Sequence, residues 1–340
     1  MRLRLCAFLL FITWSGIFKL HSQTLIPLQS GRETSIRGLS VLNNSVAWLS
    51  GSNGWTAFTN DRGKTWKWNQ IPGYEKLDFR DIEAFSDKKA IIVSAGSPAV
   101  VLLSNDSGNT WKEVYRNDSP EIFLDGMDFW NTKTGIIYGD PIAGKMALLK
   151  TTDGGISWQN INDDLNISLI PGEASFAASG TNIRCLKNGR TWIATGGKQS
   201  RIFFSADFGS SWLDFPCPII QGKSSTGPFS IAFRNSRAGI AAGGDYLADT
   251  ARTNNLLLTR NGGRTWYKPS ISTFGYRSAV DYLSRKQILA TGPSGTDLSV
   301  NGGKTWRDFS HEGFHTVMKA KKGSWILLSG NKGRISELQI

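Results

Sequence analysis

The chain has 340 residues, a formal net charge of +12 and three cysteines. This length exceeds that of an average domain, although all-β barrels and propellers often form single domains of more than about 200 residues. The positive charge favours acidic partners and excludes no fold. The basic residues are scattered rather than clustered, so nucleic acid is not an expected partner.

Residues 1–22 predict a secretory signal peptide. Arg2 and Arg4 precede an apolar run of 14 residues at positions 5–18. That run is short for a membrane span, which needs about 20 apolar residues. Cleavage after Ser22 would leave 340 − 22 = 318 residues with a net charge of +9. We therefore expect an exported protein, periplasmic or secreted, without stable membrane insertion; an uncleaved membrane anchor is the alternative.

An eight-residue pattern, Ser/Thr-x-Asp/Asn-x-Gly-x-Ser/Thr-Trp, occurs six times in the chain. Successive tryptophans are 45, 47, 54, 54 and 40 residues apart, a length suited to four short strands and their turns. The pattern therefore predicts a repeat architecture. Its acidic or amide positions are Asp61, Asp106, Asp153, Asp207, Asn261 and Asn301, and its tryptophans are Trp66, Trp111, Trp158, Trp212, Trp266 and Trp306.

The composition of this pattern is typical of a hairpin turn. The Asp or Asn side chain accepts hydrogen bonds from backbone N–H groups just ahead of it, and the glycine reaches backbone angles that strain other residues. The tryptophan begins the next strand with a large apolar surface to bury. Each copy offers at most one acidic ligand, whereas a calcium loop needs several, so no metal is expected.

The six copies resemble the Asp-box, or bacterial neuraminidase repeat, of sialidases and of many non-enzymatic propellers. The resemblance implies that each box joins the two outer strands of a blade, away from the central channel.

The segments between the boxes supply the remaining strands of seven units. Unit seven, at residues 313–340, has only three strands, and residues 24–28 are the natural source of the fourth. We therefore predict one domain at residues 23–340, a seven-bladed β-propeller of four-stranded antiparallel blades, closed by the N-terminal strand. The expected first strands lie in residues 35–42, 79–85, 124–130, 182–187, 229–233, 276–283 and 314–320.

Cysteine is sparse for an exported protein. Cys6 lies in the signal peptide, which leaves Cys185 on the innermost strand of blade four and Cys217 on its outermost strand. Three strand spacings separate them by about 14 Å, whereas bridged Cα atoms lie within about 7 Å. Two free thiols are therefore predicted.

Alignment of the first strands predicts a ring of polar side chains at the channel mouth. Four arginines facing one funnel would suit carboxylates or phosphates, which guanidinium groups bind through paired hydrogen bonds. Pairing of each arginine with a neighbouring acid is the alternative. The aligned residues are Arg37, Arg80, Asp125, Arg184, Ser230, Arg277 and His315.

Several irregular segments interrupt the repeat, and loops on one rim of a rigid scaffold often carry binding sites. They are residues 139–144, 171–181, 196–201, 221–228 and 243–255. Within them, Asp140, Glu173, Asp245 and Tyr246 form the first candidate cluster, with ordinary surface loops as the alternative.

A second resemblance covers nearly the whole mature chain. The strings FRDIEAF, MDFW followed by GDP, EASFAASGTNI, WIATGG and GGDY are similar to exported propellers related to the photosystem II stability and assembly factor. The resemblance implies a propeller that binds a protein client without catalysis. No GxGxxG follows a strand, so no cofactor is expected.

Two functions follow from these observations. The first is a non-catalytic, monomeric, assembly-factor-like module that binds an acidic protein segment or a small anion at the basic channel mouth. The second is a sialidase-like exo-glycosidase, in which Arg37, Arg80 and Arg277 hold a sugar carboxylate. Its catalytic groups would be Glu173, Asp140 and either Tyr246 or Tyr276. The first strands lack the proline that sialidases place after this arginine.

Overall fold

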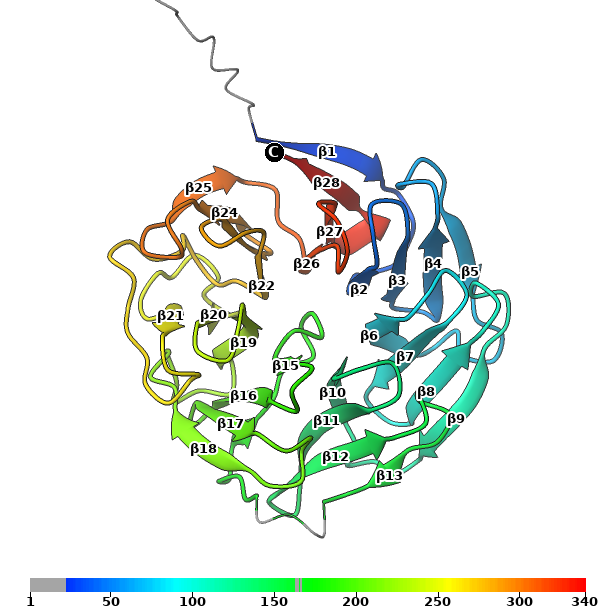
Figure 1. The fold of residues 1–340 in the computed structure, drawn as a ribbon, viewed down its shortest axis with the longest axis horizontal. Coiled ribbons are helices and arrows are strands. Elements are labelled where there is room, and N and C mark those ends of the chain that lie inside the picture. The colour runs from blue at the N-terminus through cyan, green and yellow to red at the C-terminus, as the bar shows by residue number, and fades with distance from the viewer. Residues whose placement is uncertain (1–22, 163–164, 166) are drawn as a thin grey trace, which may run out of the picture.

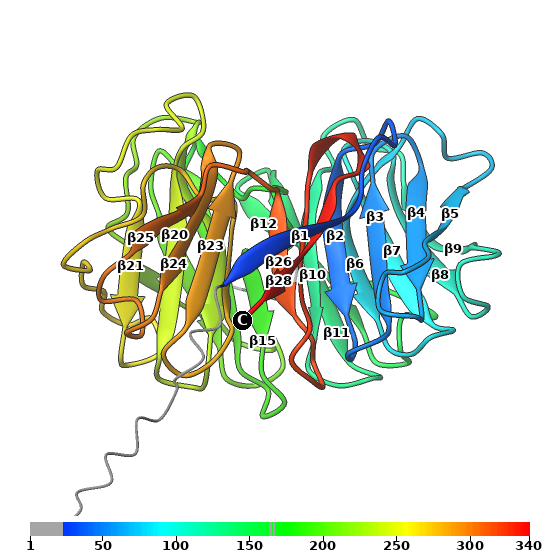
Figure 2. The same cartoon turned by 90° about the horizontal axis from the view of Figure 1, so that it is seen from above.

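The computed structural model describes residues 23–162, 165 and 167–340, so the predicted signal peptide at residues 1–22 lies outside the described residues. Seven antiparallel sheets surround a central axis, seen along that axis in Figure 1 and from the side in Figure 2. The predicted all-β seven-bladed propeller is confirmed. In the described part of the chain, no helix combines the length and apolar character of a membrane span.

The blades follow one another in chain order, each running from the axis outward. Blades one to three contain β2 (Ile36–Val41), β3 (Ala47–Gly51), β4 (Trp55–Thr59) and β5 (Lys67–Gln70); β6 (Asp78–Ala84), β7 (Ala90–Ala95), β8 (Ala99–Ser104) and β9 (Lys112–Asn117); and β10 (Leu124–Phe129), β11 (Gly135–Ile142), β12 (Lys145–Thr151) and β13 (Gln159–Asn160). Blades four and five contain β14 (Glu173–Ala174), β15 (Ile183–Cys185), β16 (Thr191–Gly197), β17 (Arg201–Ser205) and β18 (Leu213–Pro216); and β19 (Thr226–Phe233), β20 (Gly239–Asp245) and β21 (Leu256–Thr259). Blades six and seven contain β22 (Ala279–Tyr282), β23 (Ile288–Gly292), β24 (Gly295–Ser299) and β25 (Arg307–Ser310); and β26 (Thr316–Lys319), β27 (Ile326–Ser329), β28 (Ile335–Gln339) and β1 (Thr24–Gln29).

The N-terminal strand closes the ring as predicted. β1 pairs antiparallel with β28, and Leu25 faces Leu338 in the register. This pairing completes blade seven, whose other strands all come from the C-terminal end of the chain (Figure 1).

Two blades depart from the four-stranded plan. Blade four gains the short strand β14, which pairs with the end of β16. Blade five has three strands, and its fourth is reduced to a single bridge between Leu258 and Tyr267. Pro269 occupies the next hydrogen-bonding position along this ladder, and proline has no N–H to donate.

The core consists of apolar clusters between neighbouring blades. Trp48 of blade one, for example, is 1% exposed and packs with Phe79 and Ile92 of blade two. Trp192 of blade four stacks on Phe233 of blade five with ring centroids 4.0 Å apart. Each such side chain contributes about 1.5–3 kcal/mol of burial free energy, so the blades stabilise one another.

The Asp-box turns have the predicted geometry and position. In the first box, Asp61 Oδ1 accepts the Thr65 N–H at 3.0 Å, and Oδ2 accepts the Thr65 hydroxyl at 2.6 Å. The Thr59 hydroxyl accepts the N–H of Gly63, whose φ of +73° favours glycine. All six boxes repeat this pattern and follow the third strand of their blade. They lie at the rim, away from the axis.

The box tryptophans are less uniformly buried than predicted. Trp158 and Trp306 are buried, whereas the tryptophans of the other four boxes are half-buried. Their indoles cover the outer edge of the interface between blades, where solvent reaches one side of the ring.

The predicted free thiols are confirmed. Cys185 ends β15 next to the axis, Cys217 follows β18 at the rim, and both are buried and unbridged. Burial raises the pKa of the Cys217 thiol to about 12, and it also raises the pKa of the Cys185 thiol well above its usual value.

Candidate ligand-binding site

Four innermost strands carry a β-bulge at the same level of the propeller. In β2, β6, β10 and β19 the register skips one residue, and the extra residues are Arg37, Arg80, Asp125 and Phe229. A bulge turns the extra side chain away from the regular alternation of the strand. All four side chains line one cavity.

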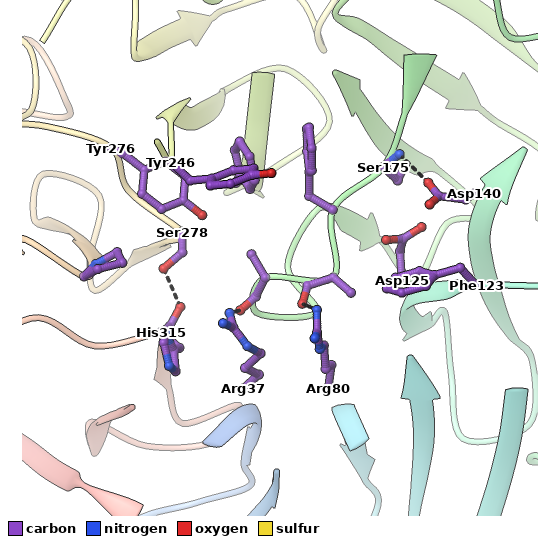
Figure 3. Close-up of a pocket in the computed structure, with 15 residues that line it drawn as sticks. Arg37, Arg80, Phe123, Asp125, Asp140, Ser175, Tyr246, Tyr276, Ser278 and His315 are labelled. Carbon is purple, nitrogen blue, oxygen red and sulfur yellow. Dashed lines mark hydrogen bonds between the residues drawn. The ribbon is translucent and has the colours of Figure 1, made fainter. Parts of the chain in front are cut away.

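This cavity lies at one mouth of the central channel and has a volume of about 450 Å³. Figure 3 shows its arginines on one side, its carboxylates on a second and its tyrosines on a third. The lining residues are Arg37, Arg80, Phe123, Asp125, Asp140, Ser175, Phe176, Ala177, Ala178, Phe229, Tyr246, Tyr276, Ser278, Pro293 and His315.

The irregular segment at residues 171–181 enters the channel and forms the floor of this cavity. The Ser179 hydroxyl donates to the Ser278 carbonyl at 2.7 Å, and the Thr181 and Ser230 hydroxyls lie 2.7 Å apart. A Cβ at Gly180 would lie 2.3 Å from Asp81, so the close approach requires glycine. The segment is therefore not an ordinary surface loop, because it packs between blades inside the channel.

The two arginines in the cavity use few of their donors on the protein. Arg37 Nη1 donates to the Ala178 carbonyl at 2.8 Å, and no carboxylate of the described residues pairs with Arg37. Arg80 Nε pairs with Asp78 at 2.7 Å, while its Nη1 lies 3.5 Å from the Ala177 carbonyl. Burial and the charge of Arg80 both lower the pKa of Arg37. A bound anion would relieve this repulsion.

The carboxylates form a second wall. Asp125 is 1% exposed, and burial together with the nearby Asp140 raises its pKa well above the usual 3.8. Asp140 Oδ1 accepts the Ser175 N–H at 2.9 Å, and burial raises the pKa of this carboxyl as well. The cavity therefore holds two cations and two carboxyls whose pKa values are raised.

Aromatic rings form the third wall. Phe176 stacks on Phe229 with centroids 3.8 Å apart, and Tyr276 meets the same Phe229 edge-on at 4.7 Å. Tyr246 lies at the rim, 47% exposed. Such rings offer apolar contact area with little loss of side-chain entropy.

His315 lines the cavity as predicted but adds no charge at neutral pH. Its Nε2 lies 2.8 Å from Asn331 Oδ1. Burial and the charge of Arg37 lower the pKa of His315 to about 4, so the ring is neutral at pH 7.

Two of the four predicted arginines lie outside the cavity. Arg277 is 1% exposed and pairs with Asp297 at 2.6 Å. Ser278, the next residue, lines the cavity where Arg277 was expected. Arg184 lies further along the channel, within 3.9 Å of Asp128. The expectation that four arginines face one funnel is wrong for these two, which pair with acids instead.

Two of the predicted loop residues are also outside the cavity. Glu173 is fully buried against Arg201, with two short contacts of 2.6 and 2.9 Å. Asp245 accepts the Leu247 N–H and lies 3.8 Å from Lys223. Of the cluster, only Asp140 and Tyr246 line the cavity. Arg277 and Glu173, two of the residues expected for a sialidase-like site, therefore lie outside the cavity.

Two phenylalanines of the aromatic wall, Phe176 and Phe229, were not among the residues predicted from the sequence, whereas Tyr246 and Tyr276 were. Phe229 follows Pro228 directly and occupies the bulge position, one residue before the predicted Ser230. Phe176 lies in the segment that forms the floor. Within the described residues, no group of three or more His, Cys, Asp or Glu side chains is placed to hold a metal ion.

Comparisons with known proteins agree with this architecture. Residues 22–121 match the family model for the photosynthesis system II assembly factor YCF48. The solved structure "YCF48 bound to D1 peptide" aligns with a TM-score of 0.68 at 14% identity, covering 94% of this chain and 97% of that one. YCF48 from Cyanidioschyzon merolae aligns with a TM-score of 0.64 at 16% identity, covering 93% and 98%.

A GH74 xyloglucanase from Xanthomonas campestris also shares the fold, with a TM-score of 0.61 at 14% identity, covering 93% of this chain and 53% of that one. A comparison with curated protein sequences gives no match. The resemblance to the photosystem II assembly-factor propellers is confirmed: the chain is an Asp-box propeller similar to YCF48.

Proposed function

We propose that this YCF48-like propeller is an exported, non-catalytic assembly factor that binds an acidic segment of a protein partner in the channel-mouth cavity. One observation carries the proposal: β-bulges on neighbouring strands direct Arg37 and Arg80 into the same cavity. The structure of YCF48 bound to D1 peptide supports a peptide as the ligand class.

The free donors of the two arginines favour a carboxylate. Among the described residues, Arg37 Nε and Nη2 and Arg80 Nη2 have no hydrogen-bond partner. A guanidinium binds a carboxylate through two parallel hydrogen bonds, and partial burial strengthens this attraction.

The aromatic wall favours a peptide over a small anion. A cavity of about 450 Å³ accommodates a few side chains, and Phe229, Tyr246 and Tyr276 offer apolar contacts that a small anion does not use. Next to Tyr246, Leu247 is 78% exposed and extends this surface outside the cavity. Aromatic residues are enriched at the centre of protein interfaces.

Binding of ten-residue peptide pools to the purified protein tests the proposal. The pools have random flanks and a fixed central pair, Glu–Gln or Gln–Gln. We expect the Glu–Gln pool to bind more tightly and to weaken as salt increases. The double substitution Arg37→Gln and Arg80→Gln should remove the difference between the pools.

The matched control is Arg264→Gln, because Arg264 lies exposed in the fifth Asp-box and lines no part of the cavity. This substitution should leave binding unchanged. Equal binding of both pools by the unaltered protein, or Glu-dependent binding that survives the double substitution, would reject the proposal. Binding of acetate or phosphate in place of every peptide would identify a small-anion site.

A further inference from the structure

We infer that the bound segment is dipolar: it places a basic side chain beside its acidic one, and Asp125 and Asp140 receive the basic group. This inference rests on the proposed function for its acidic half. The basic half rests on a separate observation, a buried carboxylate in the cavity without a partner.

Asp125 is the central residue of this subsite. The bulge in β10 directs it into the cavity, where it is 1% exposed. Within the described residues, neither carboxylate oxygen has a hydrogen-bond partner of good geometry; the charge of Arg80 and a weak interaction with the Ala177 N–H oppose its desolvation. Buried carboxylates without partners are rare because their desolvation is costly.

Asp140 makes the same wall a two-carboxylate site. It lies in β11, the strand next to β10, and uses Oδ1 to accept the Ser175 N–H. No described residue donates to its Oδ2. Asp125 and Asp140 are close enough for their charges to repel, and a cation between them would remove that repulsion (Figure 3).

Among the described residues, no basic side chain forms an ion pair with either carboxylate of this wall. The charge of Arg80 acts on Asp125 without such a pair, and Arg80 Nε pairs with Asp78. Tyr138 also faces the two carboxyls, but its hydroxyl has no hydrogen-bond partner of good geometry among the described residues. A basic group of a ligand would supply the partner that these carboxylates lack among the described residues.

The arginines and the carboxylates line one cavity, so one peptide can contact both walls. The arginines come from the first strands of blades one and two, and the carboxylates come from blade three. All four side chains line the same cavity, so an acidic and a basic side chain next to each other would reach both walls at once.

Two further peptide pools test the inference, with Glu–Lys and Gln–Lys as the fixed central pair. We expect the Glu–Lys pool to bind about tenfold more tightly than the Glu–Gln pool. The substitutions Asp125→Asn and Asp140→Asn together should abolish this preference. Asp118→Asn, at a surface carboxyl that is 67% exposed, is the matched control.

The outcomes separate the two proposals. If the Glu–Gln and Glu–Lys pools bind equally, or if the preference survives in the double Asn variant, the dipolar ligand is rejected and the acidic ligand stands. If the Glu–Gln pool binds no better than the Gln–Gln pool, and the Glu–Lys pool no better than the Gln–Lys pool, both the acidic ligand and the dipolar ligand are rejected.

A measurement on the unaltered protein avoids any folding defect of the variants. Calorimetry of one Glu–Lys peptide and its Glu–Gln analogue, in two buffers of different ionisation enthalpy, measures protons exchanged on binding. A cation seated on Asp125 and Asp140 lowers their raised pKa values, so in the pH range where these carboxyls titrate only the Lys peptide should release protons. The titrations are therefore repeated across a series of pH values, and equal proton exchange by both peptides at every pH would overturn the inference.

Discussion

Arg201 donates two hydrogen bonds to Glu173, from Nε to Oε1 at 2.9 Å and from Nη2 to Oε2 at 2.6 Å. The same Nη2 donates to the Ser168 carbonyl, and the Thr195 hydroxyl donates to Glu173 Oε1. Glu173 lies near the start of the segment at residues 171–181, which forms the cavity floor. The pair therefore fixes the base of that segment to blade four.

Removing one partner of this pair should destabilise the protein strongly. Arg201→Met leaves the carboxylate of Glu173, which is 0% exposed, without its cation. We expect the free energy of unfolding to fall by about 3–5 kcal/mol, measured by urea denaturation.

The control for this prediction is Arg116→Met. Arg116 pairs with Asp118 at 2.8 Å, but the two side chains are 44% and 67% exposed, so the loss of stability should be far smaller than in Arg201→Met. Equal losses in the two variants would show that the Glu173 pair is no more important than a surface contact.

The Asp-box carboxylates should make the stability of the protein depend on pH in the acid range. The Thr65 hydroxyl and N–H hold the pKa of Asp61 down to about 2, below the usual 3.8. A carboxyl whose pKa is lowered on folding stabilises the protein fully above about pH 4 and loses that effect as the pH falls through 2.

Asp61→Asn isolates this effect, because two boxes carry Asn naturally and Asn261 still accepts the Thr265 N–H at 3.0 Å. The unaltered protein should have the higher Tm at pH 7. Its advantage should shrink as the pH falls from 4 to 2, measured by thermal unfolding across this range. A difference in Tm that does not change with pH would contradict the assignment.

Tyr246 should contribute to ligand binding and little to stability. Its ring is half exposed at the rim and meets Phe229 edge-on at 6.0 Å. Tyr246→Ala should weaken peptide binding about tenfold, since truncated aromatic contacts typically cost more than 1 kcal/mol. Tyr267→Ala, at a 38% exposed ring on the outer edge of blade five, should leave peptide affinity unchanged.

Neither Cys185 nor Cys217 should react with thiol reagents in the folded protein. Both are buried, and their raised pKa values keep the reactive thiolate scarce. Labelling with a maleimide followed by peptide mass analysis should find both residues modified only after denaturation. Modification of either residue in the folded protein, at the rate of an exposed thiol, would contradict this burial.

The outer half of each blade was predictable because local chemistry determines it. An Asp-box forms its turn from hydrogen bonds within eight residues, so Asp61 and its five counterparts could be assigned without knowledge of the ring. The closure of blade seven by β1 followed from counting strands, because an unpaired edge is unfavourable.

The channel mouth was only partly predictable because its geometry depends on bulges. Arg37, Arg80 and Asp125 were placed correctly, since their strands share the bulge. In blade six the alignment was off by one residue, so Arg277 was expected where Ser278 lies. The entry of residues 171–181 into the channel depends on contacts with several blades, which no local pattern encodes.

The pairing of β1 with β28 also affects how the ring closes during folding. Leu25 and Leu338 face each other across 338 − 25 = 313 positions of chain, so the ring stays open until nearly all of the described residues have been synthesised. Until then, β1 has no partner within its own chain and is free to pair with another. Under crowded conditions this joint is where two molecules would exchange strands and form a domain-swapped dimer.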